Sequence, residues 1–118
     1  TETFLAKAKH MDVKPVLYRQ ILDNYYEYSF EARETPGYKI CFFSSGNKID
    51  SKTAERKMLL SILIMEGITK NKLTKIQFSD GMKIKPSIVS RWLSGTHNFT
   101  IETLIEIELF LNIKLLNI

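Results

Sequence analysis

The chain has 118 residues and a mass of 13.7 kDa, which fits one domain, or one domain plus an arm, and allows a core without disulfides or a metal. Its composition, 44% hydrophobic and 25% charged, excludes wholesale disorder. One cysteine, Cys41, excludes an internal disulfide framework, and with two histidines it cannot complete a structural zinc site unless carboxylates join it. We therefore expect no metal and no cofactor, and we expect Cys41 to be a small buried apolar residue.

The net charge of +4 is unevenly distributed along the chain. Residues 1–50 carry seven basic and seven acidic groups, residues 51–98 carry nine basic and three acidic groups (net +6), and residues 99–118 carry one basic and three acidic groups (net −2). A localised basic stretch indicates a polyanionic partner, although a solvated lysine-rich face would show the same pattern.

Neither a membrane segment nor a secretion leader is visible. The longest nearly apolar run, residues 58–65, is far shorter than the ~20 residues of a membrane helix, so we expect no membrane partner. No basic and then apolar leader opens the chain, so we expect a cytoplasmic protein. Residues 1–10 are either a leader derived from a vector, because Met11 follows them where a start codon could stand, or a native arm.

Residues 11–49 are expected to hold one helix and one apolar segment. Pro15 can begin a helix, and apolar side chains follow it at helical spacing, so we predict an amphipathic helix over residues 15–32, stopped by Pro36-Gly37. Residues 38–43, rich in β-branched and aromatic side chains, form either a short strand or an apolar segment on the core. The predicted helix carries Val16, Leu17, Ile21, Leu22, Tyr25, Tyr26 and Tyr28; its tyrosines are either a helix packing face or a stacking platform for single strands.

The pattern from residue 50 onward predicts four helices. The first covers residues 50–66 and ends at Gly67. The second covers residues 70–78 behind an N-cap at Thr69 and buries Leu73 and Ile76.

After a turn at residues 79–81, a short third helix runs from Pro86 to about residue 93, with Gly95 ending it. Thr100 caps a fourth helix that reaches about Asn112. The apolar residues 113–118 are expected to pack on the core or pair with another chain.

Three segments of this half resemble the Cro/CI-type (XRE-like) helix-turn-helix. They are Thr69-Lys-Asn-Lys-Leu73, Pro86-Ser-Ile-Val-Ser-Arg-Trp-Leu-Ser-Gly95 and Thr-His-Asn-Phe-Thr-Ile-Glu-Thr-Leu104. Within them, residues 90–100 resemble small regulators that act as antitoxins of the HigA-like kind. The resemblance implies a mainly α fold: a helix-turn-helix bundle of four to five helices (lambda-repressor-like) with an N-terminal extension. It divides the chain into an N-terminal arm or helix of unknown role (residues 1–49) and a DNA-binding domain (residues 50–118).

The resemblance also implies roles for individual residues. Val89 and Trp92, three positions apart, would share the buried face of the recognition helix, while Ser87 and Arg91, four apart, would point together into a groove. By resemblance, the residues that contact base edges are Lys85, Pro86, Ser87 and Arg91. Phosphate contacts would come from helix starts and loops, namely Thr69, Lys70, Asn71, Lys72, Lys83, Thr96, His97 and Asn98.

Plainer interpretations stand beside these roles. Arg91 could be an ordinary exposed charge, and His97 a side chain that only bonds within its loop. The sequence also departs from the family, because Leu73 and Val89 are sixteen positions apart, about five more than usual, which predicts a longer second helix or a longer turn around residues 78–84.

Three function classes follow, and the first is the leading one. It is a sequence-specific double-stranded DNA-binding transcriptional regulator, a repressor that binds its operator as a homodimer. The second is a protein-binding module in which residues 12–49 or the tail 113–118 neutralise a toxin or another partner, a role compatible with being an antitoxin. The third, an enzyme, has no support, because no acid/base pair, phosphate-binding loop or nucleophile elbow is visible.

Overall fold

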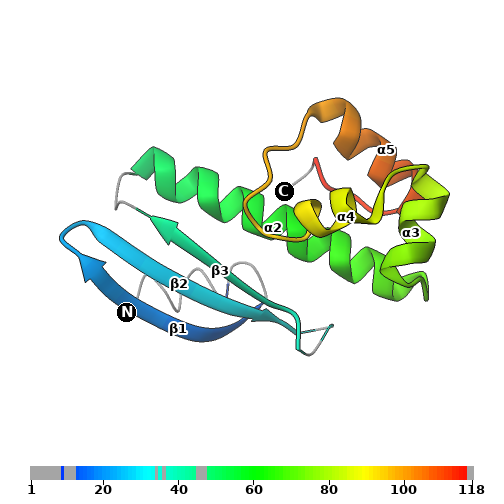
Figure 1. Cartoon of the computed structure of the whole chain (residues 1–118). Coiled ribbons are helices and arrows are strands. Elements are labelled where there is room, and N and C mark those ends of the chain that lie inside the picture. Colours follow the sequence, from blue (N-terminus) through cyan, green and yellow to red (C-terminus); the bar gives the residue numbers. More distant parts are fainter. Residues whose placement is uncertain (1–8, 10–12, 34, 36, 45–47, 117–118) are drawn as a thin grey trace.

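A computed structural model of the protein describes residues 9, 13–33, 35, 37–44 and 48–116. In this part, a three-stranded antiparallel sheet, ordered β1-β2-β3, precedes four helices (Figure 1). The long helix α2 covers one face of the sheet and continues into the group of shorter helices. The elements are β1 (Val13–Leu22), β2 (Tyr25–Ala32), β3 (Lys39–Ser44), α2 (Lys48–Lys70), α3 (Lys75–Met82), α4 (Pro86–Trp92) and α5 (Ile101–Leu111).

The helix predicted over residues 15–32 is wrong, because this segment is the β1-β2 hairpin. Leu22 pairs with Tyr25 across the two-residue turn Asp23-Asn24, in which Asn24 takes a left-handed conformation (φ 61°). Asparagine tolerates this conformation better than most residues, so the turn suits a tight hairpin. The expectation of a mainly α fold with a helical arm is therefore corrected: the N-terminal extension is a sheet.

The buried apolar side chains alternate along β2, as the two-residue period of a strand requires, although Glu27 and Ser29 between them are buried as well. Tyr28, Phe30 and Ala32 face α2, where they pack against Met58 and Ile62. Tyr26 and Tyr28 are thus part of a packed sheet face, and Tyr18 stacks on Tyr26 with ring centroids 5.9 Å apart. By contrast, the residues that suggested a helix, including Val16, Leu17, Ile21, Leu22 and Tyr25, are exposed.

Of the two alternatives predicted for residues 38–43, a strand or an apolar segment on the core, the structure shows the strand, β3. Ile40 is buried against the α2 side of the sheet, so its neighbour Cys41 projects to the opposite side. Cys41 is exposed, with its sulfur 2.7 Å from the hydroxyl of Ser29 on the paired strand, so the expectation that it is buried was wrong. A turn at Gly37, which has a φ of +90°, connects β2 to β3.

Helix α2 does not end at Gly67, as predicted, but continues to Lys70. Gly67 is buried where the C-terminal segment crosses the helix: a Cβ built there would lie 3.0 Å from Ile113 Cδ1 and 3.1 Å from Leu111 Cδ1. The glycine therefore serves close packing and does not end the helix.

A second hydrophobic core lies between α2, the shorter helices and the C-terminal segment. Its buried members include Ile64 and Ile68 of α2, Phe78 of α3, and Val89 and Trp92 of α4. Leu115 is fully buried in this core, so the tail packs on its own domain, as one of the two alternatives for residues 113–118 expected. Residues 117–118, like most of the predicted leader or arm at residues 1–10, lie outside the described part of the chain.

Candidate nucleic-acid interface

Two short helices joined by a three-residue turn form the candidate site. Helix α3 begins behind Thr74, whose hydroxyl accepts a hydrogen bond from the Gln77 N–H (3.1 Å), while the Gln77 side chain accepts one from the Thr74 N–H (2.9 Å). This reciprocal capping box fixes the start of the helix. The prediction that Thr69 caps a helix over residues 70–78 is therefore wrong by about five residues, and Ile76, predicted to be buried, is 63% exposed.

The turn between the two helices is also short, so neither a longer second helix nor a longer turn, the two predicted alternatives, is observed. Helix α3 includes residues 79–81, which were predicted to form a turn, and ends at Met82. Lys83 then takes a left-handed conformation (φ 59°), and the Ile84 N–H donates to the Ser79 carbonyl (3.0 Å), which closes the helix end. Only residues 83–85 separate α3 from α4. The apparent extra residues came from the misplaced second helix.

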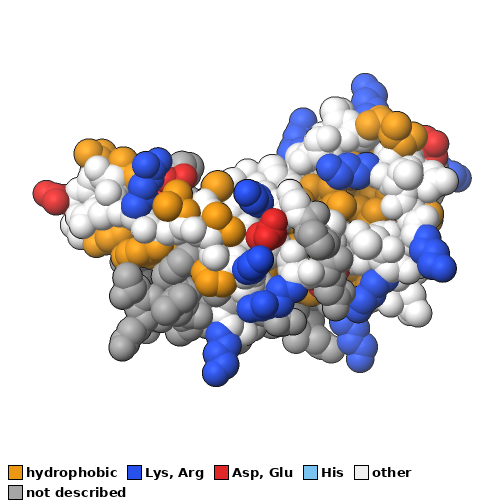
Figure 2. Space-filling model, turned by 90° about the horizontal axis from the view of Figure 1, so that it is seen from below, with side chains coloured by type: hydrophobic (Ala, Val, Ile, Leu, Met, Phe, Trp, Pro, Cys, Tyr) orange, Lys and Arg blue, Asp and Glu red, His pale blue; other side chains and the backbone are white. Residues whose placement is uncertain are grey.

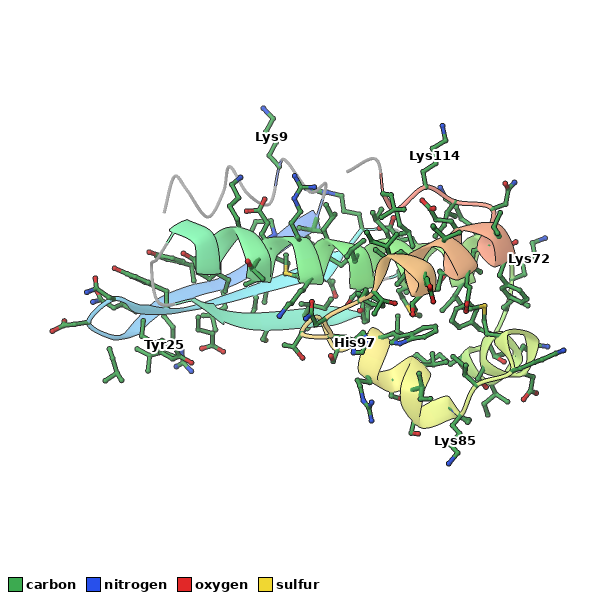
Figure 3. All side chains as sticks on the ribbon, turned by 90° about the horizontal axis from the view of Figure 1, so that it is seen from above. Lys9, Tyr25, Lys72, Lys85, His97 and Lys114 are labelled. Carbon is green, nitrogen blue, oxygen red and sulfur yellow. The ribbon has the colours of Figure 1, made fainter. Side chains whose placement is uncertain are left out.

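Helix α4 has one buried and one exposed face, as predicted. Val89 (1% exposed) and Trp92 (6%) pack inward, and the Trp92 ring meets the Phe78 ring edge-on at a centroid distance of 6.2 Å. Ser87, Ser90 and Arg91 are exposed, as are Lys85 and Pro86 at the start of the helix. Figure 3 shows the Lys85 side chain pointing away from the body of the protein. The four residues predicted to contact bases therefore lie together at an exposed surface.

The end of α4 is held by hydrogen bonds from two distant segments. The buried hydroxyl of Ser61 in α2 donates to the Trp92 carbonyl (2.6 Å) and accepts from the Gly95 N–H (3.1 Å). The Tyr38 hydroxyl donates to the Leu93 carbonyl (2.6 Å). Gly95 has a φ of +90°, as its glycine predicted, although α4 already ends at Trp92. These bonds fix the orientation of α4 on both α2 and the sheet.

The loop after α4 places the next predicted residues beside that helix. Thr96 and Asn98 are exposed, and the Thr96 N–H donates to the Ser94 hydroxyl (3.2 Å). The half-buried His97 ring meets Phe99 edge-on, with centroids 4.7 Å apart. Burial lowers the pKa of His97, and the charges of Arg91 and Lys57 lower it further. His97 therefore lies in a positive environment that also contains Arg91.

The predicted phosphate contacts at residues 69–72 lie elsewhere, at the end of α2 and not at a helix start. The Thr69 hydroxyl donates to the Met65 carbonyl (3.0 Å), and the Asn71 amide donates to the carbonyls of Gly67 (2.7 Å) and Leu111 (3.0 Å). These side chains are thus committed to backbone groups. In the view of Figure 3, α3 lies between Lys72 and Lys85.

Residues at the true start of α3 were missed by the sequence analysis. Thr74, Lys75 and Gln77 are exposed at the helix N-terminus, where backbone N–H groups favour anions. The signal was present in the sequence, because Thr74-x-x-Gln77 has the spacing of a capping box.

Charged and hydrophobic side chains are unevenly distributed over the surface of the molecule (Figure 2). On the face shown in Figure 2, most lysine and arginine side chains lie over the middle of the molecule and at its helix-turn-helix end, while hydrophobic side chains are visible at both ends. Among the described residues, no group of three or more His, Cys, Asp or Glu could hold a metal ion. Within the same residues, no helix combines the length and apolarity needed to cross a membrane.

Comparison with known proteins agrees with this geometry. A sequence model of the helix-turn-helix family matches residues 64–117, from the middle of α2 through the C-terminal segment. No curated protein and no solved structure gives a significant match to the chain. Residues 64–117 therefore form a helix-turn-helix domain of the Cro/CI (XRE) type, which implies DNA binding and is typical of regulators that are not enzymes.

Proposed function

We propose that the protein is a sequence-specific transcriptional regulator that binds double-stranded DNA by placing α4 in the major groove. One observation carries this proposal: Val89 and Trp92 are buried, while Ser87 and Arg91, one helical turn apart, are exposed on the other side of the helix. Such a helix can enter a groove without exposing its apolar face.

The exposed face of α4 offers suitable chemistry for base edges. The Arg91 guanidinium can donate two hydrogen bonds to guanine O6 and N7, an arrangement that discriminates against other bases by about 1–3 kcal/mol. Ser87 can bond to a base or a phosphate, and Lys85 and Pro86 lie where the helix would enter the groove. We propose Arg91 as the main determinant of sequence preference.

Phosphate contacts would hold α4 in register on the duplex. We propose that Thr96, His97 and Asn98 contact one strand from the loop after α4, and that Lys83 contributes from the turn before it. Of the predicted contacts at residues 69–72, we keep Lys70 and Lys72, whose side chains are exposed. We no longer propose Thr69 and Asn71, because their side chains are bonded to carbonyl oxygens. The α3 N-terminus replaces Thr69 and Asn71 as the proposed helix-start contact.

We further propose that the protein is a repressor that acts as a homodimer. Helix α5 supports the homodimer, because Ile101, Ile105 and Leu109, spaced by four, form an exposed apolar stripe in which Leu109 is 79% exposed. A symmetric dimer would present two copies of α4 to half-sites about 34–36 Å apart.

The direct test is selection of binding sites from a pool of duplexes with a randomised centre of about 20 base pairs. The proposal predicts enrichment of one motif with two-fold symmetry, and binding that weakens steeply as salt rises. Recovery of unenriched sequences, together with no binding at low salt, would contradict it.

A second candidate function, neutralisation of a protein partner as in HigA-like antitoxins, is supported by the hairpin. Ile21 (41% exposed), Leu22 (67%) and Tyr25 (39%) surround its turn and form an apolar tip. In the described part of the tail, Leu115 is buried, and Leu116 (45% exposed) is the large hydrophobic residue that such a surface could use. Copurification of a small protein by the wild-type chain, and its loss on Leu22→Asp, would favour this function. Strong DNA binding without any copurifying partner would count against it.

A further inference from the structure

Helix α2 extends well beyond the helix-turn-helix domain. It begins at Lys48, whereas the family match begins at residue 64. The added turns carry four basic residues, Lys48, Lys52, Arg56 and Lys57, of which Lys52 and Arg56 are exposed and Lys57 is half-buried. Two acidic residues, Asp50 and Glu55, lie in the same turns, and Glu55 is buried. The added part of α2 therefore presents positive charge at its surface.

The side of α2 that carries Ser61 faces the end of α4. The Ser61 hydroxyl is bonded to Trp92 and Gly95, so this side of α2 meets the end of α4 and the loop that follows. Lys57 is four residues earlier, and residues four apart lie on the same face of a helix. Lys57 is thus placed one turn further along α2, beside the loop that holds His97.

The electrostatics of His97 agree with that placement. Besides burial, two charges act on this ring, one from Arg91 in α4 and one from Lys57 in α2. Helix α2, helix α4 and the loop after α4 therefore bring Lys57, Arg91 and His97 into one region. Within the described part of the chain, no carboxylate pairs with Lys57 or Arg91 at ion-pair distance. Like charges gathered without a counter-charge repel one another, and a bound polyanion relieves that repulsion.

We propose that the DNA-contacting surface continues from the helix-turn-helix onto α2, where Lys57 binds a backbone phosphate next to those contacted by residues 96–98. Arg56 and Lys52 extend the positive surface along the added turns. This inference rests on the proposed function, since it takes duplex DNA as the ligand. It assigns a contact to residues that the family match does not include.

The salt dependence of binding measures this contact directly. Each phosphate neutralised on B-DNA contributes about −0.9 to the slope of log K against log salt concentration. A fluorescently labelled 30-base-pair duplex of mixed sequence is titrated with the full chain by anisotropy, at several salt concentrations between about 50 and 200 mM. We expect Lys57→Gln to weaken binding and to make the slope shallower by about 0.9. Lys57→Arg keeps the charge and should keep the wild-type slope.

Lys114→Gln is the matched control, because it removes the same charge at a distant position. Figure 3 shows Lys114 and Lys85 on opposite sides of the molecule, each pointing outward. Lys114→Gln should leave the slope unchanged. Equal slopes for Lys57→Gln, Lys114→Gln and the wild type would overturn the inference and leave the proposed function standing. No binding by the wild type at the lowest salt would overturn the proposed function itself. If thermal melting shows that Lys57→Gln is poorly folded, Lys57→Met, which keeps an unbranched apolar stem, provides the same comparison.

Discussion

The hydroxyl of Tyr38 donates a hydrogen bond to the carbonyl oxygen of Leu93, with 2.6 Å between the two oxygens. Tyr38 lies directly before β3, and Leu93 is the C-cap of α4. Burial raises the pKa of the Tyr38 phenol well above its usual range, so the group remains a donor at every ordinary pH. The N-terminal sheet is thereby bonded to the end of the helix that we propose enters the groove.

Tyr38→Phe removes this bond and keeps the ring. We expect the free energy of unfolding to fall by about 1 kcal/mol, because one partly buried hydrogen bond is lost and the Leu93 carbonyl loses a partner. Urea unfolding at pH 7 measures the change. Tyr26→Phe is the control, since Tyr26 packs on the same sheet face without this bond. Equal losses in the two variants would show that the hydroxyl of Tyr38 has no special role.

Gly95 and Gly37 share a φ of +90° but differ in their surroundings. A Cβ at Gly95 would lie 2.9 Å from Ile40 Cγ2, whereas a Cβ at Gly37 would meet nothing within 4 Å. We expect Gly37→Ala to cost roughly 1–2 kcal/mol of stability from backbone strain alone. Gly95→Ala should cost a further 1–3 kcal/mol, roughly, because the buried Ile40 must shift.

Chemical unfolding of the two alanine variants compares these costs. If both lose the same stability, the packing of Gly95 on β3 does not constrain the loop after α4.

Glu108 connects the C-terminal segment to α5 by hydrogen bonds. Its carboxylate accepts hydrogen bonds from the N–H groups of Leu115 (2.6 Å) and Leu116 (3.0 Å), and these bonds lower the pKa of the carboxyl below its ordinary value of 4.5. Because the folded-state pKa is the lower one, the stabilisation is fully present above pH 4.5 and is lost as the pH falls through the folded-state value.

Glu108→Gln should therefore be less stable than the wild type at pH 7, and the difference should shrink below pH 4.5. Thermal melting across that pH range measures it. Glu106→Gln, on an exposed position of the same helix, is the control. A difference between wild type and Glu108→Gln that does not depend on pH would contradict this assignment.

Several features of the second half could be predicted from the sequence because they depend on local chemistry. Pro86 marks the first turn of α4, Thr100 accepts from the Thr103 N–H and caps α5, and Asn112 takes the left-handed conformation that ends it. The inward placement of Val89 and Trp92 follows from helical spacing.

The start of α3 and the secondary structure of residues 15–32 were predicted wrongly, because the sequence at each place fits two local patterns. Thr69 and Thr74 are both plausible N-caps, but only Thr74 has a glutamine three residues later, and α2 continues through Thr69 because its buried face extends to Ile68. The segment 15–32 fits both a helical and a strand period. The hairpin forms because the strand period buries Tyr28, Phe30 and Ala32 against α2, a tertiary contact that no local pattern encodes.

Arg91→Ala is the most direct test of the central claim that α4 discriminates base sequence. The measured quantity is the ratio of affinities for the selected duplex and for a scrambled duplex of the same length and composition. We expect Arg91→Ala to lower that ratio by about 5- to 150-fold, the equivalent of a 1–3 kcal/mol base contact, while Lys83→Ala weakens both duplexes alike. An unchanged ratio in Arg91→Ala, with the fold intact, would contradict the account.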